Sequence, residues 1–125
     1  MAKLILRSWL LLLYIDVIMR FRDFRRLHDI VREKKVHPVI LNQRHSGQVL
    51  CLAIDWACVL YFKQVLCLQR SAATTLILRT FGWNAELVVG ARVLPFKSHA
   101  WVEIQGLVVN DKPYMQDIYE VMERC

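Results

Sequence analysis

The apolar residues change from helical to extended periodicity at Gly82, and this change does most to limit the folds open to the chain. Before it, apolar residues recur at helical spacing over 68–81, and Gly82 is a usual helix stop. After it, the β-branched run over 85–92 indicates a buried strand, and 98–111 indicates two strands around a turn at Gly106. Helices followed by strands predict an α+β fold.

The N-terminal third is apolar but does not have the pattern of a membrane span. Within 4–18, Arg7 and Asp16 leave only eight uncharged residues between them, far short of the ~20 that cross a bilayer. No small-residue cleavage site follows, which argues against a signal peptide. We therefore expect a helix with a broad apolar face that runs on, with a bend, to about residue 31.

The middle of the chain predicts a connection and a second buried helix. Pro38 discourages helix within 36–47. Residues 48–63 are almost wholly apolar, as in a helix that is buried on most sides. At the other end of the chain, 114–124 is expected to form a short closing helix.

The length of 125 residues predicts a single domain, with an N-terminal helical segment over 1–45 and a catalytic core over 46–125. The cysteines include no C-x-x-C pair, and no secretory signal precedes them, so we expect reduced thiols and a cytoplasmic protein. The histidines do not combine with the cysteines in a zinc-site spacing, and no cofactor or metal is expected. The cysteines are Cys51, Cys58, Cys67 and Cys125.

The net charge of +6 is concentrated in one segment, 20–35. Its basic face allows three interpretations: a solvated surface, a contact with an acidic peptide or partner, and attraction to a membrane surface or nucleic acid. No helix-turn-helix, aromatic RNA-binding signature or finger is present, so no nucleic acid partner is expected.

Cys67 stands where the helix over 68–81 begins. There the unpaired N–H groups and the positive end of the helix dipole favour a thiolate, and the same N–H groups can hold a developing oxyanion. A lone cysteine in such a position is more often an inert core residue. The residues that follow in the chain therefore decide its interpretation.

The register of the hairpin over 98–111 decides whether a catalytic pair forms. A three-residue loop over 104–106 would pair Glu103 with Leu107. His99 would then lie across from Asp111, with about 5 Å between the β-carbons. A two-residue turn would shift the pairing by one and put the two side chains on opposite faces. We adopt the longer loop.

The order Cys67, His99, Asp111 predicts a catalytic triad. The imidazole takes the thiol proton, and the carboxylate fixes the imidazole tautomer and stabilises the imidazolium. Attack of the thiolate on a carbonyl gives an acyl-thioester, which water or an amine resolves.

Three stretches of this sequence resemble the transglutaminase-like leader peptidases of lasso-peptide biosynthesis, the microcin-processing type. They are CLQRSAATTLILRTFG, AELVVGAR and PFKSHAWVEIQGLVVND. The resemblance implies a papain-like or transglutaminase-like fold, with N-terminal helices and a catalytic cysteine at a helix start packed on a small antiparallel sheet. It also implies a bacterial cysteine peptidase with Cys67, His99 and Asp111 as the catalytic residues.

The resemblance also implies partners. Enzymes of this family remove the leader from a ribosomally made precursor, and a cyclase resembling asparagine synthetase then closes the macrolactam. Single-chain members carry an additional N-terminal winged-helix-like domain, whereas about 45 residues that read as helix precede the core here. We therefore expect a stand-alone peptidase that receives the leader from a separate recognition protein, with Arg22, Arg25 and Arg26 in the contact.

Other functions stay open at this point. The same triad can serve an acyltransferase, in which an amine replaces water. A non-enzymatic adaptor would use the basic helix and leave the triad idle. A membrane-associated role is the third alternative.

Overall fold

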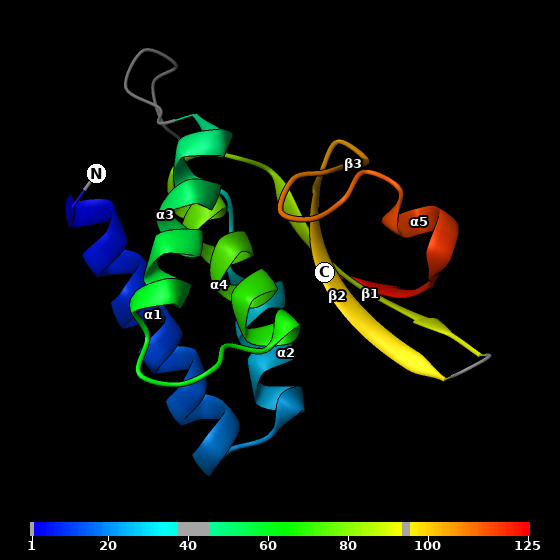
Figure 1. Cartoon of the computed structure of the whole chain (residues 1–125), viewed down its shortest axis with the longest axis horizontal. Coiled ribbons are helices and arrows are strands. Elements are labelled where there is room, and N and C mark those ends of the chain that lie inside the picture. The colour runs from blue at the N-terminus through cyan, green and yellow to red at the C-terminus, as the bar shows by residue number, and fades with distance from the viewer. Residues whose placement is uncertain (1, 38–45, 94–95) are drawn as a thin grey trace.

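The computed structural model describes residues 2–37, 46–93 and 96–125, and it confirms an α+β fold. A layer of helices packs on one face of a small antiparallel sheet (Figure 1). The helices are α1 (Ala2–Phe21), α2 (Phe24–Glu33), α3 (Gly47–Leu60), α4 (Cys67–Thr80) and the short α5 (Met115–Ile118). The strands are β1 (Ala85–Arg92), β2 (Lys97–Ile104), β3 (Leu107–Val108) and β4 (Glu120–Arg124).

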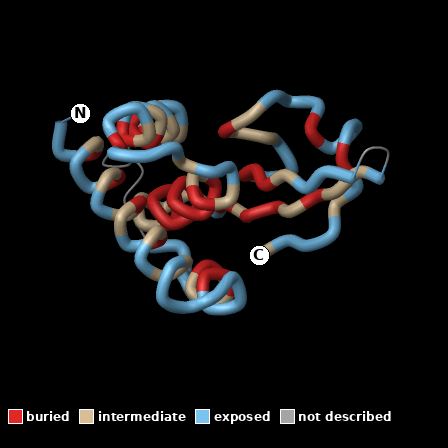
Figure 2. The backbone as a smooth tube through the Cα atoms, turned by 60° about the horizontal axis from the view of Figure 1, so that its bottom comes forward, coloured by how far each residue is buried: buried red, intermediate tan, exposed pale blue. Residues whose placement is uncertain are grey.

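Helix α4 lies at the centre of the fold. It contacts α1, α2 and α3 as well as strands β1 and β2. Figure 2 shows buried residues concentrated through the middle of the helical layer and of the strands. Two threonine hydroxyls that α4 buries donate to carbonyls of the same helix, Thr74 to Arg70 at 2.8 Å and Thr75 to Ser71 at 2.9 Å. Polar residues can therefore line a helix that is buried on nearly all sides.

The N-terminal segment forms two separate helices, not the one bent helix that the sequence predicts. Helix α1 ends at Phe21, and the side chain of Asp23 accepts a hydrogen bond from the Arg26 N–H at 3.1 Å, which starts α2. In the described part of the chain, no helix has both the length and the apolar character that crossing a bilayer requires. Most of the connection predicted over 36–47, with Pro38, lies outside the described residues.

The sheet has the order β3-β2-β1-β4, with every pair antiparallel. Its inner face joins the helical core, and its outer face carries a smaller cluster that includes Trp101 and Tyr119. Gly90 of β1 pairs with His99 of β2. A β-carbon at Gly90 would lie 2.7 Å from the Trp101 ring and 2.9 Å from Tyr119, so glycine allows both aromatic residues to approach β1.

The prediction of a closing helix over 114–124 is wrong. Only Met115–Ile118 is helical, and Glu120–Arg124 is the strand β4, which pairs with β1. The unpaired edge of β1 provides the hydrogen-bond partners that make the extended form favourable. The backbone groups of Leu87 and Cys125 continue this pairing with hydrogen bonds of 2.8 and 2.9 Å.

Candidate functional site

His99 and Asp111 lie in direct contact. The imidazole Nε2 is 2.5 Å from Asp111 Oδ2, and each side chain is about one-fifth exposed, at 22% and 20%. Burial disfavours the ionised carboxyl of Asp111. The hydrogen bonds from His99 and from the Lys112 N–H outweigh this effect and hold the pKa of Asp111 below its ordinary value of 3.8.

The ionised carboxylate assigns the imidazole tautomer. A carboxylate can only accept, so Nε2 of His99 carries the hydrogen and donates it to Asp111. In the neutral ring Nδ1 then keeps a lone pair and can take a proton. This is the arrangement that a general base with an orienting acid requires.

The hairpin that precedes Asp111 has a different register from the one that we predict. Glu103 pairs with Val108 and Ile104 with Leu107, so the turn has two residues, not three. Both turn residues are left-handed, with φ of 52° at Gln105 and 80° at Gly106. Such a turn matches the twist of the two strands, which favours it over the longer loop.

His99 and Asp111 meet because regular pairing stops before Asp111. Strand β3 ends at Val108. If the pairing continued, Asp111 would lie opposite Ala100 and on the other face from His99. The predicted contact is therefore present although the predicted register is wrong.

A buried asparagine holds the departing segment against β2 and α4. Asn110 Oδ1 accepts a hydrogen bond from the Val102 N–H at 2.8 Å, and its Nδ2 donates to Ser71 Oγ at 3.1 Å. Ser71 Oγ in turn donates to the Ala100 carbonyl at 3.0 Å. The residue before Asp111 is thus tied to both elements beside it.

Aromatic rings enclose the other side of His99. The Tyr119 ring stacks on the imidazole with 5.4 Å between centroids, and the Trp101 ring lies 6.3 Å away. The buried carboxylate of Glu103 accepts hydrogen bonds of 2.7 Å from Trp101 and Arg124. These contacts fix the ring of Trp101 and with it the surroundings of His99.

The charge of Glu103 is stabilised although the residue is only 1% exposed. Burial disfavours ionisation, but the hydrogen bonds from Arg124, Trp101 and Gln116 outweigh it and lower the pKa of the carboxyl. This role does not follow from the sequence alone, where the signal is a charged residue within the otherwise apolar run 100–104.

Cys67 is the exposed one of the four free cysteines and the first residue of α4. The other three are half-buried. Burial raises the pKa of Cys51 to about 11 and also raises the pKa of Cys58 and Cys125. Those three thiols are therefore poor nucleophiles, since the thiolate is the reactive form.

The start of α4 leaves backbone N–H groups available. The N-cap residue is Leu66, whose side chain has no acceptor, and the first helical hydrogen bond joins the Arg70 N–H to the Leu66 carbonyl at 3.0 Å. The N–H groups of residues 67–69 thus have no acceptor within the helix. An anion at this end would meet these donors and the positive end of the helix dipole.

A carboxylate from α1 secures the turn that leads into Cys67. Asp16 lies 2.6 Å from the Lys63 ammonium and accepts hydrogen bonds of 3.2 Å from Tyr61 and Gln69. The other end of the Gln69 amide accepts from the Leu66 N–H at 3.2 Å. The roles of Asp16 and Gln69 do not follow from the sequence, because the contacts of Asp16 with Tyr61 and Gln69 span more than forty residues.

The start of α4 and the histidine strand lie side by side. Ser71 is one helical turn after Cys67, and its hydroxyl contacts the carbonyl of Ala100, the neighbour of His99. The charge of Arg70 also contributes to the lowered pKa of Asp111. In the described part of the chain, no hydrogen bond joins the Cys67 thiol to His99.

Within residues 2–37, 46–93 and 96–125, no group of three His, Cys, Asp or Glu side chains could hold a metal ion. The chemistry that the described side chains offer is nucleophilic and acid–base. An accessible thiol lies at the start of a helix, and a histidine that is oriented by an aspartate lies on β2, a strand that this helix contacts.

Comparison with known proteins finds a family match over most of the chain and a partial match to a processing protein. The sequence profile of the transglutaminase-like superfamily matches residues 9–124. The microcin J25-processing protein McjB of Escherichia coli is 46% identical to the chain over 56 residues. The aligned region covers 45% of this chain and 27% of McjB, so the similarity is to about a quarter of that relative's length. No solved structure matches the chain.

Proposed function

The chain belongs to the transglutaminase-like superfamily, and we propose that it is a cysteine peptidase that removes the leader from a lasso-peptide precursor. The contact between His99 and Asp111, next to the helix that begins at Cys67, is the observation that carries the proposal. The similarity to McjB, a protein named for processing microcin J25, supports the substrate class.

In the proposed reaction Cys67 is the nucleophile. Nδ1 of His99 takes the thiol proton, while Asp111 holds Nε2 and stabilises the imidazolium. The thiolate attacks the scissile carbonyl carbon and forms the C–S bond. The oxyanion is stabilised by N–H groups at the start of α4.

The intermediate collapses in two stages. The C–N bond breaks, and the imidazolium gives its proton to the leaving amine, which departs as the free N-terminus of the core peptide. The leader stays as an acyl-thioester on Cys67. Water, deprotonated by His99, then attacks the thioester, releases the leader as a carboxylate and restores the thiol.

We also propose that the precursor is presented by a separate recognition protein and that a cyclase resembling asparagine synthetase uses the freed amine. The exposed arginines that surround the start of α2 support a protein contact, since three of them face solvent without a carboxylate partner in the described part of the chain. They are Arg22, Arg25 and Arg26.

The test is cleavage of a lasso-peptide precursor, with its recognition protein present, followed by mass spectrometry. Cys67→Ala should remove cleavage, whereas the matched control Cys51→Ala should retain it. Added amine separates hydrolysis from acyl transfer, because a transferase would give a leader with the mass of the amine adduct. If Cys67→Ala cleaved the precursor at the rate of the unchanged chain, both the cysteine-peptidase mechanism and the role of Cys67 as its nucleophile would be refuted.

A further inference from the structure

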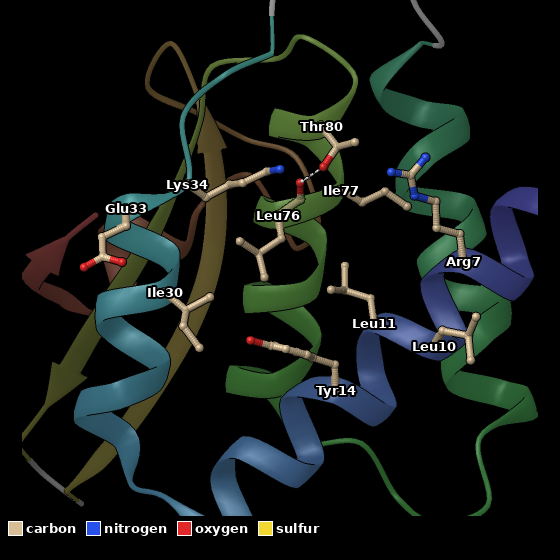
Figure 3. A pocket seen from close by; sticks show the side chains of 10 residues that line it. All are labelled: Arg7, Leu10, Leu11, Tyr14, Ile30, Glu33, Lys34, Leu76, Ile77 and Thr80. Atoms are coloured by element: carbon tan, nitrogen blue, oxygen red, sulfur yellow. Dashed lines mark hydrogen bonds between the residues drawn. The ribbon is translucent and has the colours of Figure 1, made fainter.

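A groove lies at the end of α4 remote from Cys67 (Figure 3). It encloses about 550 Å³, with α4 as its floor and α1 and α2 as its walls. We call it the α1–α2 groove. Its apolar lining is Leu10, Leu11, Tyr14, Ile30, Leu76 and Ile77.

Two cations stand at one end of this groove. Figure 3 shows the head groups of Arg7, from α1, and Lys34, which follows α2, at the end near Thr80. The carboxylate of Glu33 points outward in the same view, away from Arg7. No ion pair joins Arg7 or Lys34 to a carboxylate among the described residues. The hydroxyl of Thr80 is already used, because it donates to the Leu76 carbonyl at 2.8 Å.

The apolar wall continues beyond the groove along α1. Leu6, Leu10, Tyr14 and Val17 recur at helical spacing and are 59%, 52%, 45% and 46% exposed. The stripe spans roughly 17 Å along the helix, about three turns. A partner of similar length could cover the stripe and insert a side chain into the groove.

We propose that the α1–α2 groove binds an acidic amphipathic helix of a separate protein. The walls and floor are helices, so the groove offers side chains and no strand edge, which favours a helix with an apolar stripe over an extended peptide. Arg7, whose guanidinium lies over the Phe81 ring at 5.3 Å from its centroid, and Lys34 form no ion pair with a described carboxylate, so their positive charges favour carboxylates beside that stripe. A flat lipid surface would not enter a groove between three helices.

The proposal stands apart from the peptidase reaction. Leu76 follows Cys67 by nine residues on α4. The groove and the start of the helix are therefore separated by roughly 14 Å along the helix axis. None of the groove residues takes part in the proposed chemistry. The two proposals can therefore fail separately.

The probe is a fluorescent 14-residue peptide with leucine at helical i, i+3, i+4 and i+7 spacing and glutamate elsewhere. Fluorescence anisotropy should show saturable binding to the full chain that weakens as salt rises. Arg7→Glu/Lys34→Glu should weaken binding about tenfold or more, since two attractions become repulsions. Leu10→Ala/Tyr14→Ala should weaken it through lost apolar contact. Circular dichroism checks that each variant is folded.

The matched control Lys97→Glu/Lys112→Glu changes the net charge by the same amount at exposed positions outside the groove and should leave affinity within about twofold. Equal losses in both charge variants would overturn the proposal, because overall charge would then explain binding. Absence of saturable binding, or equal binding of a peptide with lysine in place of glutamate, would also overturn it. So would failure of the acidic peptide while vesicles of phosphatidylglycerol and phosphatidylcholine bind the chain through Arg7 and Lys34.

Discussion

Replacing Asp16 with alanine should loosen the turn that leads into Cys67. The carboxylate accepts from Gln69 and Tyr61 at 3.2 Å each and lies 2.6 Å from the Lys63 ammonium. Without it the buried Gln69 amide loses its acceptor, which costs about 1–3 kcal/mol. The half-exposed Lys63 adds about 0.2–1 kcal/mol. We therefore expect the free energy of unfolding to fall by about 1–4 kcal/mol.

The effect of Asp16 should depend on pH. The hydrogen bond from Lys63, opposed by burial and aided by Tyr61 and Gln69, lowers the pKa of Asp16 below its ordinary value of 3.8. A carboxyl with a lowered folded pKa stabilises the fold above the unfolded pKa and loses this effect as pH falls through the folded pKa. The difference between the unchanged chain and Asp16→Ala should therefore be full at pH 7 and shrink below pH 3.8.

Urea unfolding from pH 2.5 to 7 measures this difference, and hydrogen exchange localises it. Hydrogen exchange should accelerate at residues 61–66. In leader cleavage, kcat should fall while KM changes less, because the turn positions Cys67. The matched control is the exposed Asp117→Ala, which should change the free energy of unfolding by less than about 0.5 kcal/mol. An Asp16→Ala chain that is as stable as the control at pH 7 would refute the reasoning.

Three further predictions follow from the sheet. Gly90→Ala should lower the free energy of unfolding, because steric contact costs about 1–3 kcal/mol. The reduced entropy of the unfolded chain offsets about 0.4–1 kcal/mol of this loss. Gly47→Ala, whose β-carbon meets nothing closer than 3.9 Å, should change urea unfolding little. Asn110→Ala should lose about 1–3 kcal/mol in the same assay, because the Val102 N–H loses its acceptor, and should slow cleavage. Glu103→Gln should flatten the stability–pH curve below pH 4.5, since the lowered pKa of Glu103 stabilises the fold only above that range.

Local pattern was enough to predict the elements that carry the site. The helical spacing before Gly82 and the β-branched run after it gave α4 and β1 nearly to the residue. These signals lie within single segments, so one stretch of sequence contains them. The C-terminal strand was missed because β4 is stabilised by the edge of β1, some thirty residues earlier. Tertiary pairing there overrides the local helical pattern.

Polar contacts across the core could not be predicted from the sequence either, because they too join residues that are far apart in the chain. Arg79 illustrates it: the guanidinium is buried and donates to the Ala85 carbonyl at 2.8 Å, as well as to carbonyls of Val31 and Lys34. Burial lowers the pKa of Arg79. The sequence alone indicates only a basic side chain in the last turn of a helix. The contacts of Arg79 depend on the position of the C-terminal end of α2 beside α4.

The contact between His99 and Asp111 depends on a side chain more than on the turn. In an extended β3, the Val102 N–H would donate to a backbone carbonyl of that strand. Here the Asn110 amide takes that place at 2.8 Å, which ends the pairing and frees the chain to bring Asp111 to His99. The same amide reaches Ser71, one turn after Cys67. One asparagine therefore sets the positions of the acid, the histidine strand and the start of α4 relative to each other.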